Sequence, residues 1–321
     1  MIATATAPWK WIEKYGFLVW IAAALGVVAT FLPGIGIRAG GAARWLNLPG
    51  GFVFEPSELL RVALSLAFAT LLTKRQEFLG RWEWLGRFLF IALPIMIVLK
   101  QPDFGSFSIC FLVLSSLLFA FGLPWGVIVA GAATAIPAFY VLVMNVPYRK
   151  ARVMAFLDPW SDPARKGFQV IQSMLSFASG GVTGSGMGEG QGKLFFLPEA
   201  HTDFTLAVLG EEMGFIGFFI VLALYGFIVL RGLQIAARVE DRFQKSLVLG
   251  LTLTFAYSVF VNVGVVLGML PTKGLTLPFL SYGGSSLITT CFLFGLILNA
   301  ESQDRQTLPT GVRAARVFKK R

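Results

Sequence analysis

Charged residues, histidine and cysteine are scarce in this chain of 321 residues. Asp, Glu, Lys and Arg together make up 14% of it, and it has one histidine, His201, and two cysteines, Cys110 and Cys291. Both cysteines lie inside apolar runs, so they predict neither a disulfide framework nor a cysteine-ligated metal site. With 56% hydrophobic residues and a mean hydropathy of +0.73, the composition excludes an ordinary soluble domain and is typical of a polytopic membrane protein.

The balance of charge is strongly basic, at +10, which in a soluble protein would suggest nucleic-acid binding. Here most lysines and arginines lie in short segments between apolar runs, a pattern typical of cytoplasmic loops. The 31 phenylalanines and 8 tryptophans suit lipid-facing surfaces and the bilayer interface. We therefore expect membrane lipid as a partner and no nucleic acid.

Apolar runs close to the roughly 20 residues that a bilayer core requires occur eight times. They are residues 15–33, 57–73, 84–99, 104–122, 124–146, 204–230, 246–268 and 279–299. The first run is long enough to span, so no cleavable signal peptide is expected. The pattern predicts an all-α polytopic membrane protein with about eight transmembrane helices.

Lysine and arginine predict the orientation of these spans. One set of connections carries most of the basic residues, including six in the tail from Arg305 to Arg321. The short connections on the other side carry only Arg38, Arg44, Lys100 and Lys273. We expect the first side, and with it both termini, to be cytoplasmic. The chain then divides into a transmembrane domain, 1–300, and a basic cytoplasmic tail, 301–321.

One outer loop, 147–203, is about 57 residues long. Loops beyond about 15 residues that lack elements of their own are usually functional or disordered. This loop has an amphipathic stretch, Phe168–Phe177, and a glycine-rich run, Gly180–Gly192, so we expect it to fold as a cap. The glycine run has no G-K-[ST] ending and no preceding strand, so it is not a phosphate loop. A loop that permits close backbone approach is the better interpretation.

Asp203 is the candidate catalytic residue. We expect a helix to begin near Pro198 and to continue into the apolar run from Phe204, because proline and acidic residues suit a first turn. On that helix Asp203 and Glu211 share a face with Glu199. Asp203 either caps this helix or acts as a general base toward an attacking hydroxyl, and spacing alone leaves both open. If pyrophosphate is the leaving group, one carboxylate suffices, unlike in glycoside hydrolysis.

Further polar residues are expected to contact the substrate. Arg149 and Arg152 follow a turn at a membrane exit, where guanidinium groups could bind phosphate oxygens bidentately; the alternative is attraction to anionic headgroups. The full set of expected substrate contacts is Arg149, Arg152, Lys193, Glu199, His201, Lys273, Ser281 and Tyr282.

A second set of polar residues is expected to be structural or to line a cavity. Glu58 and Arg61 are spaced i, i+3 on one span, where most such pairs neutralise one another. The turn containing Asp103 could add a polar wall, and Glu211 belongs to this set as well. Between Pro271 and Pro278 the chain is too polar and glycine-rich for a lipid-facing helix, so it is either a plain hairpin or a cavity-lining segment.

Six motifs, in order over almost the whole chain, resemble the SEDS family, the membrane glycosyltransferases of shape, elongation, division and sporulation. They are EPSE (55–58), QPDFG (101–105), FLDPW (156–160), LPEAHTDF (197–204), GEEMG (210–214) and MLPTKGLTLPFLSYGGSS (269–286). The pairing of LPEAHTDF with LPTKGLTLP is more similar to the division member of the family than to the elongation member.

The resemblance implies polymerisation of lipid II, a disaccharide-pentapeptide on undecaprenyl pyrophosphate, into peptidoglycan glycan strands. It implies a bacterial inner-membrane protein at the division septum. Its implied partners are a class B penicillin-binding protein transpeptidase and other divisome proteins. Asp203, the aspartate of the HTDF motif, is the implied catalytic residue. No cofactor is implied, and a divalent cation stays an open alternative.

The chain departs from the family pattern in three places. The family usually has ten spans, and the first two have no counterpart among the eight predicted here. Glu55 stands where relatives usually have glutamine, and residues 188–193 read GEGQGK where they tend to have Asn-Ser-x-Gln-Lys.

The alternatives to a septal polymerase are a lipid II flippase, an elongation-type polymerase and a non-catalytic division scaffold. A flippase should show polar groups that continue to the cytoplasmic side, and often internal repeats. The sequence shows no repeat, and its distinctive polar residues concentrate on the outer side, which favours a polymerase.

Overall fold

The structure is a computed structural model. It describes residues 1–39, 42–73, 81–122, 126, 131, 133, 153–154, 156–163, 167–190, 201–272 and 274–307. The chain divides into two compact units. The first comprises Met1–Asp103, Val229–Thr254 and Leu287–Arg321, and the second comprises Phe104–Ile228 and Phe255–Ser286. Each unit is described by itself.

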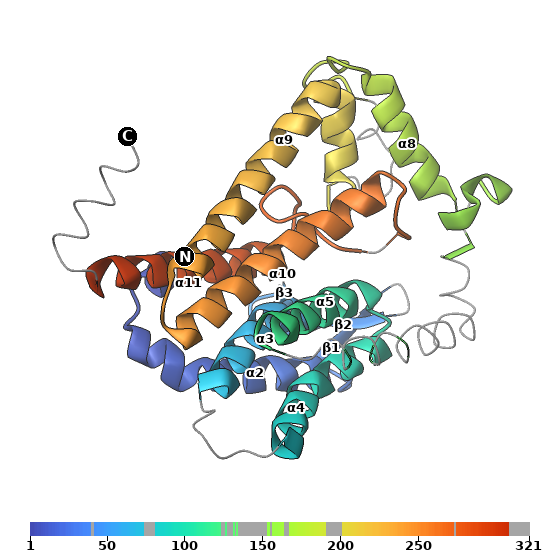
Figure 1. Ribbon diagram of the computed structural model, residues 1–321. Helices are drawn as coiled ribbons and strands as arrows, with labels where there is room; N and C mark the ends of the chain where they lie inside the picture. The colour runs from blue at the N-terminus through green and yellow to red at the C-terminus, as the bar shows by residue number, and fades with distance from the viewer. Residues whose placement is uncertain are drawn as a thin grey trace, which may run out of the picture. The chain divides into compact units, whose positions relative to one another are not determined.

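Helices dominate both units (Figure 1). The first unit holds α1 (Ile2–Ala5), α2 (Trp9–Ala29), α3 (Pro56–Thr73) and α4 (Arg81–Lys100). The second holds α5 (Phe104–Ala120), the 3-10 turn η1 (Pro159–Ser161) and α8 (Phe168–Gly180). Three helices have residues in both units: α9 (Thr205–Arg238), α10 (Arg242–Val266) and α11 (Gly284–Thr307).

The predicted spans correspond to these helices. Within the described residues, five helices are long and apolar enough to cross a membrane, namely α2, α3, α9, α10 and α11. Two shorter apolar helices, Leu89–Lys100 and Phe104–Ala120, match the predicted spans 84–99 and 104–122. The predicted span 124–146 lies almost wholly outside the described residues. The prediction of a polytopic helical membrane protein is confirmed.

A small antiparallel sheet follows the first span and was not predicted. Its strands are β1 (Gly36–Ala39), β2 (Ala42–Leu48) and β3 (Phe52–Phe54), in the order β1-β2-β3. Gly50 and Gly51 join β2 to β3 with φ of 86° and 76°, a backbone conformation that glycine adopts without strain. The sheet lies in a segment that hydropathy predicts only as a connection between two spans.

In the first unit α3 is the buried helix. Leu60, Leu64 and Phe68 are fully buried along it, and α2 packs against it. Where the two helices approach, Gly26 of α2 faces Pro56 and Gly16 faces Leu66. Small residues at such contacts let helices pack closely in a membrane, where lipid removes the hydrophobic drive for association.

Helix α9 is broken at Gly214, whose φ of 64° and ψ of −165° are not helical. A short piece, 205–213, therefore meets a long piece, 215–238, at a sharp bend near the top of Figure 1. At 1.5 Å per residue the long piece measures about 36 Å, enough to cross a bilayer core of about 30 Å. The predicted span 204–230 is therefore not one continuous helix but two pieces that meet at Gly214.

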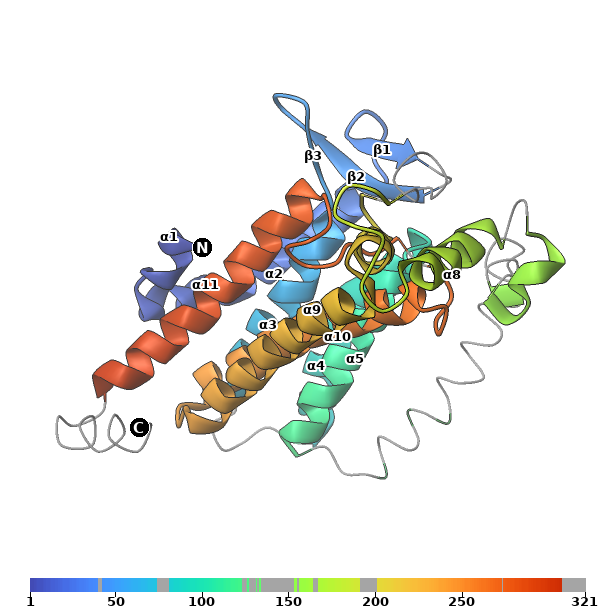
Figure 2. The same cartoon turned by 90° about the horizontal axis from the view of Figure 1, so that it is seen from above.

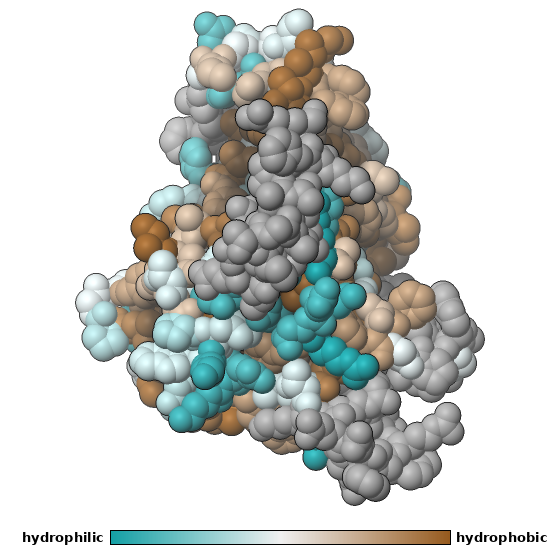
Figure 3. Space-filling view, turned by 60° about the vertical axis from the view of Figure 1, so that its left-hand side comes forward, coloured by the Kyte–Doolittle hydropathy of each residue, from teal (hydrophilic) through white to brown (hydrophobic). Residues whose placement is uncertain are grey.

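The long piece of α9 is suited to contact lipid. Its exposed large apolar side chains are Phe215, Ile216, Phe219, Ile220, Leu224, Phe227, Leu230 and Leu233. On the face drawn in Figure 3, hydrophobic residues, coloured brown, lie at the surface. Exposed apolar surface of this extent is expected where acyl chains replace water.

The glycine-rich loop after α8 fills the break in α9. The amides of Ser185 and Gly186 donate to the carbonyls of Glu211 and Glu212, at 3.0 and 3.1 Å. On the other side of the break, the amides of Phe215 and Ile216 donate to loop carbonyls 181 and 182, at 2.9 and 3.2 Å. These bonds replace those that the helix loses, which is necessary because unpaired backbone groups are costly in a membrane protein.

The glycines permit this insertion. A Cβ on Gly184 would overlap the carbonyl oxygen of Glu212, and one on Gly214 would overlap the main chain of Gly184. The predicted close backbone approach is therefore confirmed. The predicted amphipathic stretch is α8, which lies beside α9 in both Figure 1 and Figure 2 and contacts it through Phe177 and Phe218, whose rings are 5.2 Å apart.

Candidate functional site

Asp203 lies in a turn, not in a helix. Residues 201–203 form the turn, Phe204 is buried, and α9 begins at Thr205. The prediction that a helix begins near Pro198 and carries Asp203 is therefore wrong. Phe204, whose carbonyl accepts from the amides of Ala207 and Val208 at 2.9 and 3.3 Å, takes the N-cap position. The half-buried Asp203 side chain thus belongs to a non-helical segment whose position must be set by other contacts.

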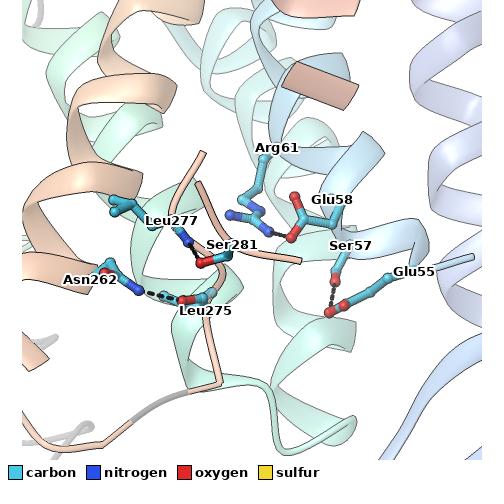
Figure 4. Close-up of polar contacts among 8 residues, drawn as sticks. All are labelled: Glu55, Ser57, Glu58, Arg61, Asn262, Leu275, Leu277 and Ser281. Carbon is cyan, nitrogen blue, oxygen red and sulfur yellow. Dashed lines mark hydrogen bonds and ion pairs between the residues drawn. The ribbon is translucent and has the colours of Figure 1, made fainter. Parts of the chain in front are cut away.

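The segment 267–283, between α10 and α11, is also irregular. The predicted interruption of helix around Pro271 and Pro278 is confirmed. Its backbone is held internally by the Leu277 amide, which donates to the Ser281 hydroxyl at 2.8 Å (Figure 4). Asn262 of α10 donates to the Leu275 carbonyl at 2.6 Å in the same view.

The Asp203 turn and this segment are joined by hydrogen bonds. The Tyr282 amide donates to the His201 carbonyl at 2.8 Å. The Thr205 hydroxyl donates to the Ser281 hydroxyl at 3.3 Å. Asn262 donates to the Asp203 carbonyl at 3.1 Å in addition to its bond to the segment. Residues that are distant in the sequence therefore form one site around Asp203.

Three predicted substrate contacts belong to this site. His201 and Tyr282 are exposed, Tyr282 by 82%, and Ser281 is half-buried. The exposed imidazole and phenol can contact a ligand, whereas the Ser281 hydroxyl is already engaged in main-chain and side-chain bonds. Five other predicted contacts lie outside the described residues: Arg149, Arg152, Lys193, Glu199 and Lys273.

Glu211 is buried at the break in α9, with 5% of its surface exposed. A Cβ on Gly190 would lie 2.9 Å from Glu212 Cγ and 3.4 Å from Glu211 Cδ. The glycine-rich loop therefore covers both carboxyl groups closely. Glu211 is therefore buried beside the glycine-rich loop, and its structural role stays a prediction.

In the first unit, Glu58 and Arg61 form the predicted ion pair, and both are buried (Figure 4). Breaking such a pair on one side leaves an uncompensated buried charge. In the same unit the Ser57 hydroxyl donates to the Glu55 carboxyl at 2.9 Å. The ion pair and this contact lie at the start of α3.

The predicted turn at Gln101–Asp103 is present and buried, with Gln101 1% and Asp103 2% exposed. The Gln101 amide donates to the Val27 carbonyl at 3.1 Å and to the Thr30 hydroxyl at 2.6 Å, which fixes the turn to α2. Arg44 of β2 donates to the carbonyl of residue 102 at 2.6 Å. The unpredicted sheet thus contributes to holding this turn.

The carboxyl group of Glu55, just before α3, has its pKa raised from 4.5 to about 8. Burial is the main cause, followed by the negative charges of Glu58 and Asp103; Arg61 and Ser57 act in the opposite direction. At neutral pH the group is therefore mostly protonated. A protonated glutamic acid is neutral and has nearly the same shape as glutamine, the residue that relatives in the SEDS family usually have at this position.

We expect Glu55→Gln to abolish a pH dependence of stability. Because the folded state raises this pKa, the stabilisation is complete below about pH 4.5 and is lost as the pH rises through about 8. The thermal midpoint of the wild type should fall from pH 6 to pH 9, while that of the variant stays level. Each kcal/mol of difference corresponds to about 2–4 °C.

The matched control is Glu13→Gln, which removes an exposed carboxylate at the start of α2. It should keep the wild-type dependence. Parallel curves for wild type and Glu55→Gln would show that Glu55 is ionised throughout.

No group of three or more His, Cys, Asp or Glu that could hold a metal ion occurs in the part of the chain that the structure describes.

Comparison with known proteins identifies the family. The family described as "Cell cycle protein", which comprises FtsW, RodA and SpoVE, matches residues 1–306. The chain is 43% identical over 309 residues to the "Probable peptidoglycan glycosyltransferase FtsW" of Geobacter metallireducens, covering 96% of this chain and 82% of that protein. The chain belongs to the FtsW/RodA/SpoVE family, and it is an integral membrane protein.

Solved structures share its fold. One, reported as "Structural coordination of polymerization and crosslinking by a peptidoglycan synthase complex", has a TM-score of 0.78 at 30% identity, over 94% of this chain and 85% of that chain. The rod shape determining protein RodA of Thermus thermophilus has a TM-score of 0.68 at 27% identity, over 94% of this chain and 82% of that one. The resemblance to the SEDS family found in the sequence is confirmed.

Proposed function

We propose that this protein is a peptidoglycan glycosyltransferase that polymerises lipid II in septal cell-wall synthesis. Family membership and the FtsW relatives support the activity and the septal role. The observation that carries the proposal is the Asp203 turn, bonded to the irregular segment 267–283 through Asn262, Thr205 and Tyr282. A carboxylate in a turn with several fixed main-chain contacts is what a general base requires.

In the proposed reaction Asp203 takes the proton from the attacking sugar hydroxyl of one lipid II or glycan chain. That oxygen forms the new bond to the anomeric carbon of the donor, whose bond to pyrophosphate breaks with inversion. The bonding electrons leave with undecaprenyl pyrophosphate, so no acid partner is required. His201 in the turn and Tyr282 next to it are both exposed, and they contact the sugars. Ser281 holds the segment that carries Tyr282.

Basic residues of the outer loop, and Lys273 of the segment 267–283, have a separate proposed role. Arg149, Arg152, Lys193 and Lys273 bind the pyrophosphate, and Glu199 contributes to the acceptor side. Guanidinium forks suit phosphate oxygens better than lysine does. These five positions rest on the sequence alone.

The proposed partner is a class B penicillin-binding protein transpeptidase within the divisome. One structural relative is a peptidoglycan synthase complex in which polymerisation and crosslinking are coordinated, which supports pairing with a crosslinking enzyme. The test is to incubate the purified chain, alone and with its transpeptidase, with labelled lipid II and to separate the glycan products. Polymer, in larger amount with the partner, is expected. Transfer of lipid II across vesicle membranes without polymer would instead establish the flippase.

The proposed topology places both termini, and the tail from 301 onward, in the cytoplasm. Reporter fusions at residues 78 and 238 are expected to read cytoplasmic, and a fusion at 165 periplasmic, because of the asymmetry of lysine and arginine. Alkaline phosphatase activity and fluorescent-protein maturation measure the two sides. A cytoplasmic reading at 165 would contradict both the topology and an outer-side site.

A further inference from the structure

We propose that Asn262 is a positioning residue for glycan polymerisation. Its side-chain amide ties the main chain at Asp203 to the segment 267–283 and thereby sets where the Asp203 carboxylate lies. The inference rests on the proposed function, because it concerns the same reaction.

The geometry around Asn262 is specific. The residue lies on α10, is 2% exposed, and donates from one nitrogen to two carbonyl oxygens, of Asp203 at 3.1 Å and of Leu275 at 2.6 Å. Both carbonyls belong to non-helical backbone, which needs partners from elsewhere when it is buried in a membrane protein. An amide nitrogen carries two hydrogens and can serve both acceptors at once.

Two other contacts of the turn hold the residues on either side of Asp203. The Tyr282 amide binds the carbonyl of His201, two residues before, and the Thr205 hydroxyl binds Ser281, two residues after. Phe204 is buried with 2% exposure and anchors the start of α9. Asn262 donates directly to the main-chain carbonyl of Asp203. Fixing that carbonyl restricts the backbone dihedrals, and these determine the direction of the carboxylate.

Loss of this contact should act on the chemical step. A catalytic group has to be held within about 0.5 Å of its productive position, and a misplacement of about 1 Å costs about a hundredfold in rate. Because Asn262 is buried and donates to main-chain carbonyls, its loss should leave the substrate contacts in place. We expect kcat to fall about a hundredfold while KM changes by less than about threefold.

The chain offers a matched control in Asn299. This residue of α11 is also buried and also donates from its amide to two main-chain carbonyls, of Thr4 and Ala7, each at 2.8 Å. It holds the N-terminal segment and no part of the proposed site. Asn299→Leu therefore removes the same number and kind of hydrogen bonds as Asn262→Leu does.

The experiment measures initial rates of polymerisation over a range of lipid II concentrations for the full chain with its transpeptidase. Both leucine variants are expected to lower the thermal midpoint, and only Asn262→Leu is expected to lower kcat. Equal kcat for Asn262→Leu and the wild type would overturn the proposal. A different result, a wild-type protein that makes no polymer, would contradict the proposed function.

A second variant keeps the test decisive if Asn262→Leu does not fold. Asn262→Asp has nearly the same shape; its protonated carboxyl has one donor, and its carboxylate has none. The activity of this variant relative to the wild type should rise as the pH is lowered through the titration of the new carboxyl group. A constant ratio across the pH range would contradict a donor role for Asn262.

Discussion

Asp203→Asn is expected to abolish glycan polymerisation while leaving expression and partner binding intact. The amide keeps the size and most of the hydrogen bonding of the carboxylate but cannot accept the proton of the attacking hydroxyl. Positioned proton transfer is typically worth on the order of 10²–10⁴ in rate. The turn is held through main-chain carbonyls and amides, so the substitution should not disturb its fold. The measurement is polymer yield from labelled lipid II with the purified complex.

Two further variants test whether Asp203 acts as a precisely placed base or only through its negative charge. Asp203→Glu keeps the charge and should still lose about a hundredfold, since the additional methylene displaces the carboxylate by about an ångström. Glu211→Gln should instead reduce the thermal midpoint and cause partial loss, because Glu211 is buried at the break in α9. Wild-type polymerisation by Asp203→Asn would contradict the general-base role and leave Asp203 a structural residue of the turn.

Most of the helical architecture could be predicted from hydropathy. A span in lipid needs a continuous apolar run, and its length is fixed by the bilayer, so α2, α3, α10 and α11 follow from the sequence within several residues. The Glu58–Arg61 pair could be predicted for a similar reason, because charges inside a helical bundle are costly unless they are neutralised. Both inferences need only the local sequence and the fact that the bilayer interior is apolar and of fixed thickness.

Several residues of the site could be predicted from the sequence, but the hydrogen bonds that join them could not. Asp203 and the segment around Ser281 were both singled out, yet the residue that joins them, Asn262, was not assigned a role. A single asparagine inside an apolar helix is the only signal, and it does not indicate which carbonyls it binds. Similarly, the β1–β3 sheet depends on pairing between strands, which the hydropathy of residues 34–55 does not indicate.

The break in α9 was missed because apolar periodicity continues across it. Residues 204–230 form one apolar run whose only charged residues are Glu211 and Glu212, and glycine inside such a run is usually tolerated. What decides the break is tertiary: main-chain groups of the loop 181–186 take the hydrogen bonds of residues 211–216. Nothing in the sequence indicates that the loop 181–186 and residues 211–216 contact each other.

Gly214→Ala is expected to destabilise the protein severely. The φ of 64° and ψ of −165° at this position lie in a region that is essentially restricted to glycine, with a cost of about 1–3 kcal/mol for other residues. A Cβ would also lie 2.6 Å from the Val182 carbonyl oxygen and closer still to the Gly184 amide nitrogen. Both neighbours are main-chain atoms that cannot rotate away, so overpacking should add about as much again.

The control in the same helix is Gly226→Ala. Gly226 lies in the long piece of α9, and a Cβ there would meet nothing within 4 Å. Alanine is favoured over glycine in a helix by about 1 kcal/mol, so this variant should be neutral or slightly stabilising. Thermal midpoints and monodispersity in detergent, followed by polymerisation assays, distinguish the two variants. If Gly214→Ala matches the wild type in all three, α9 runs straight through residue 214, and the glycine-rich loop does not fill a break.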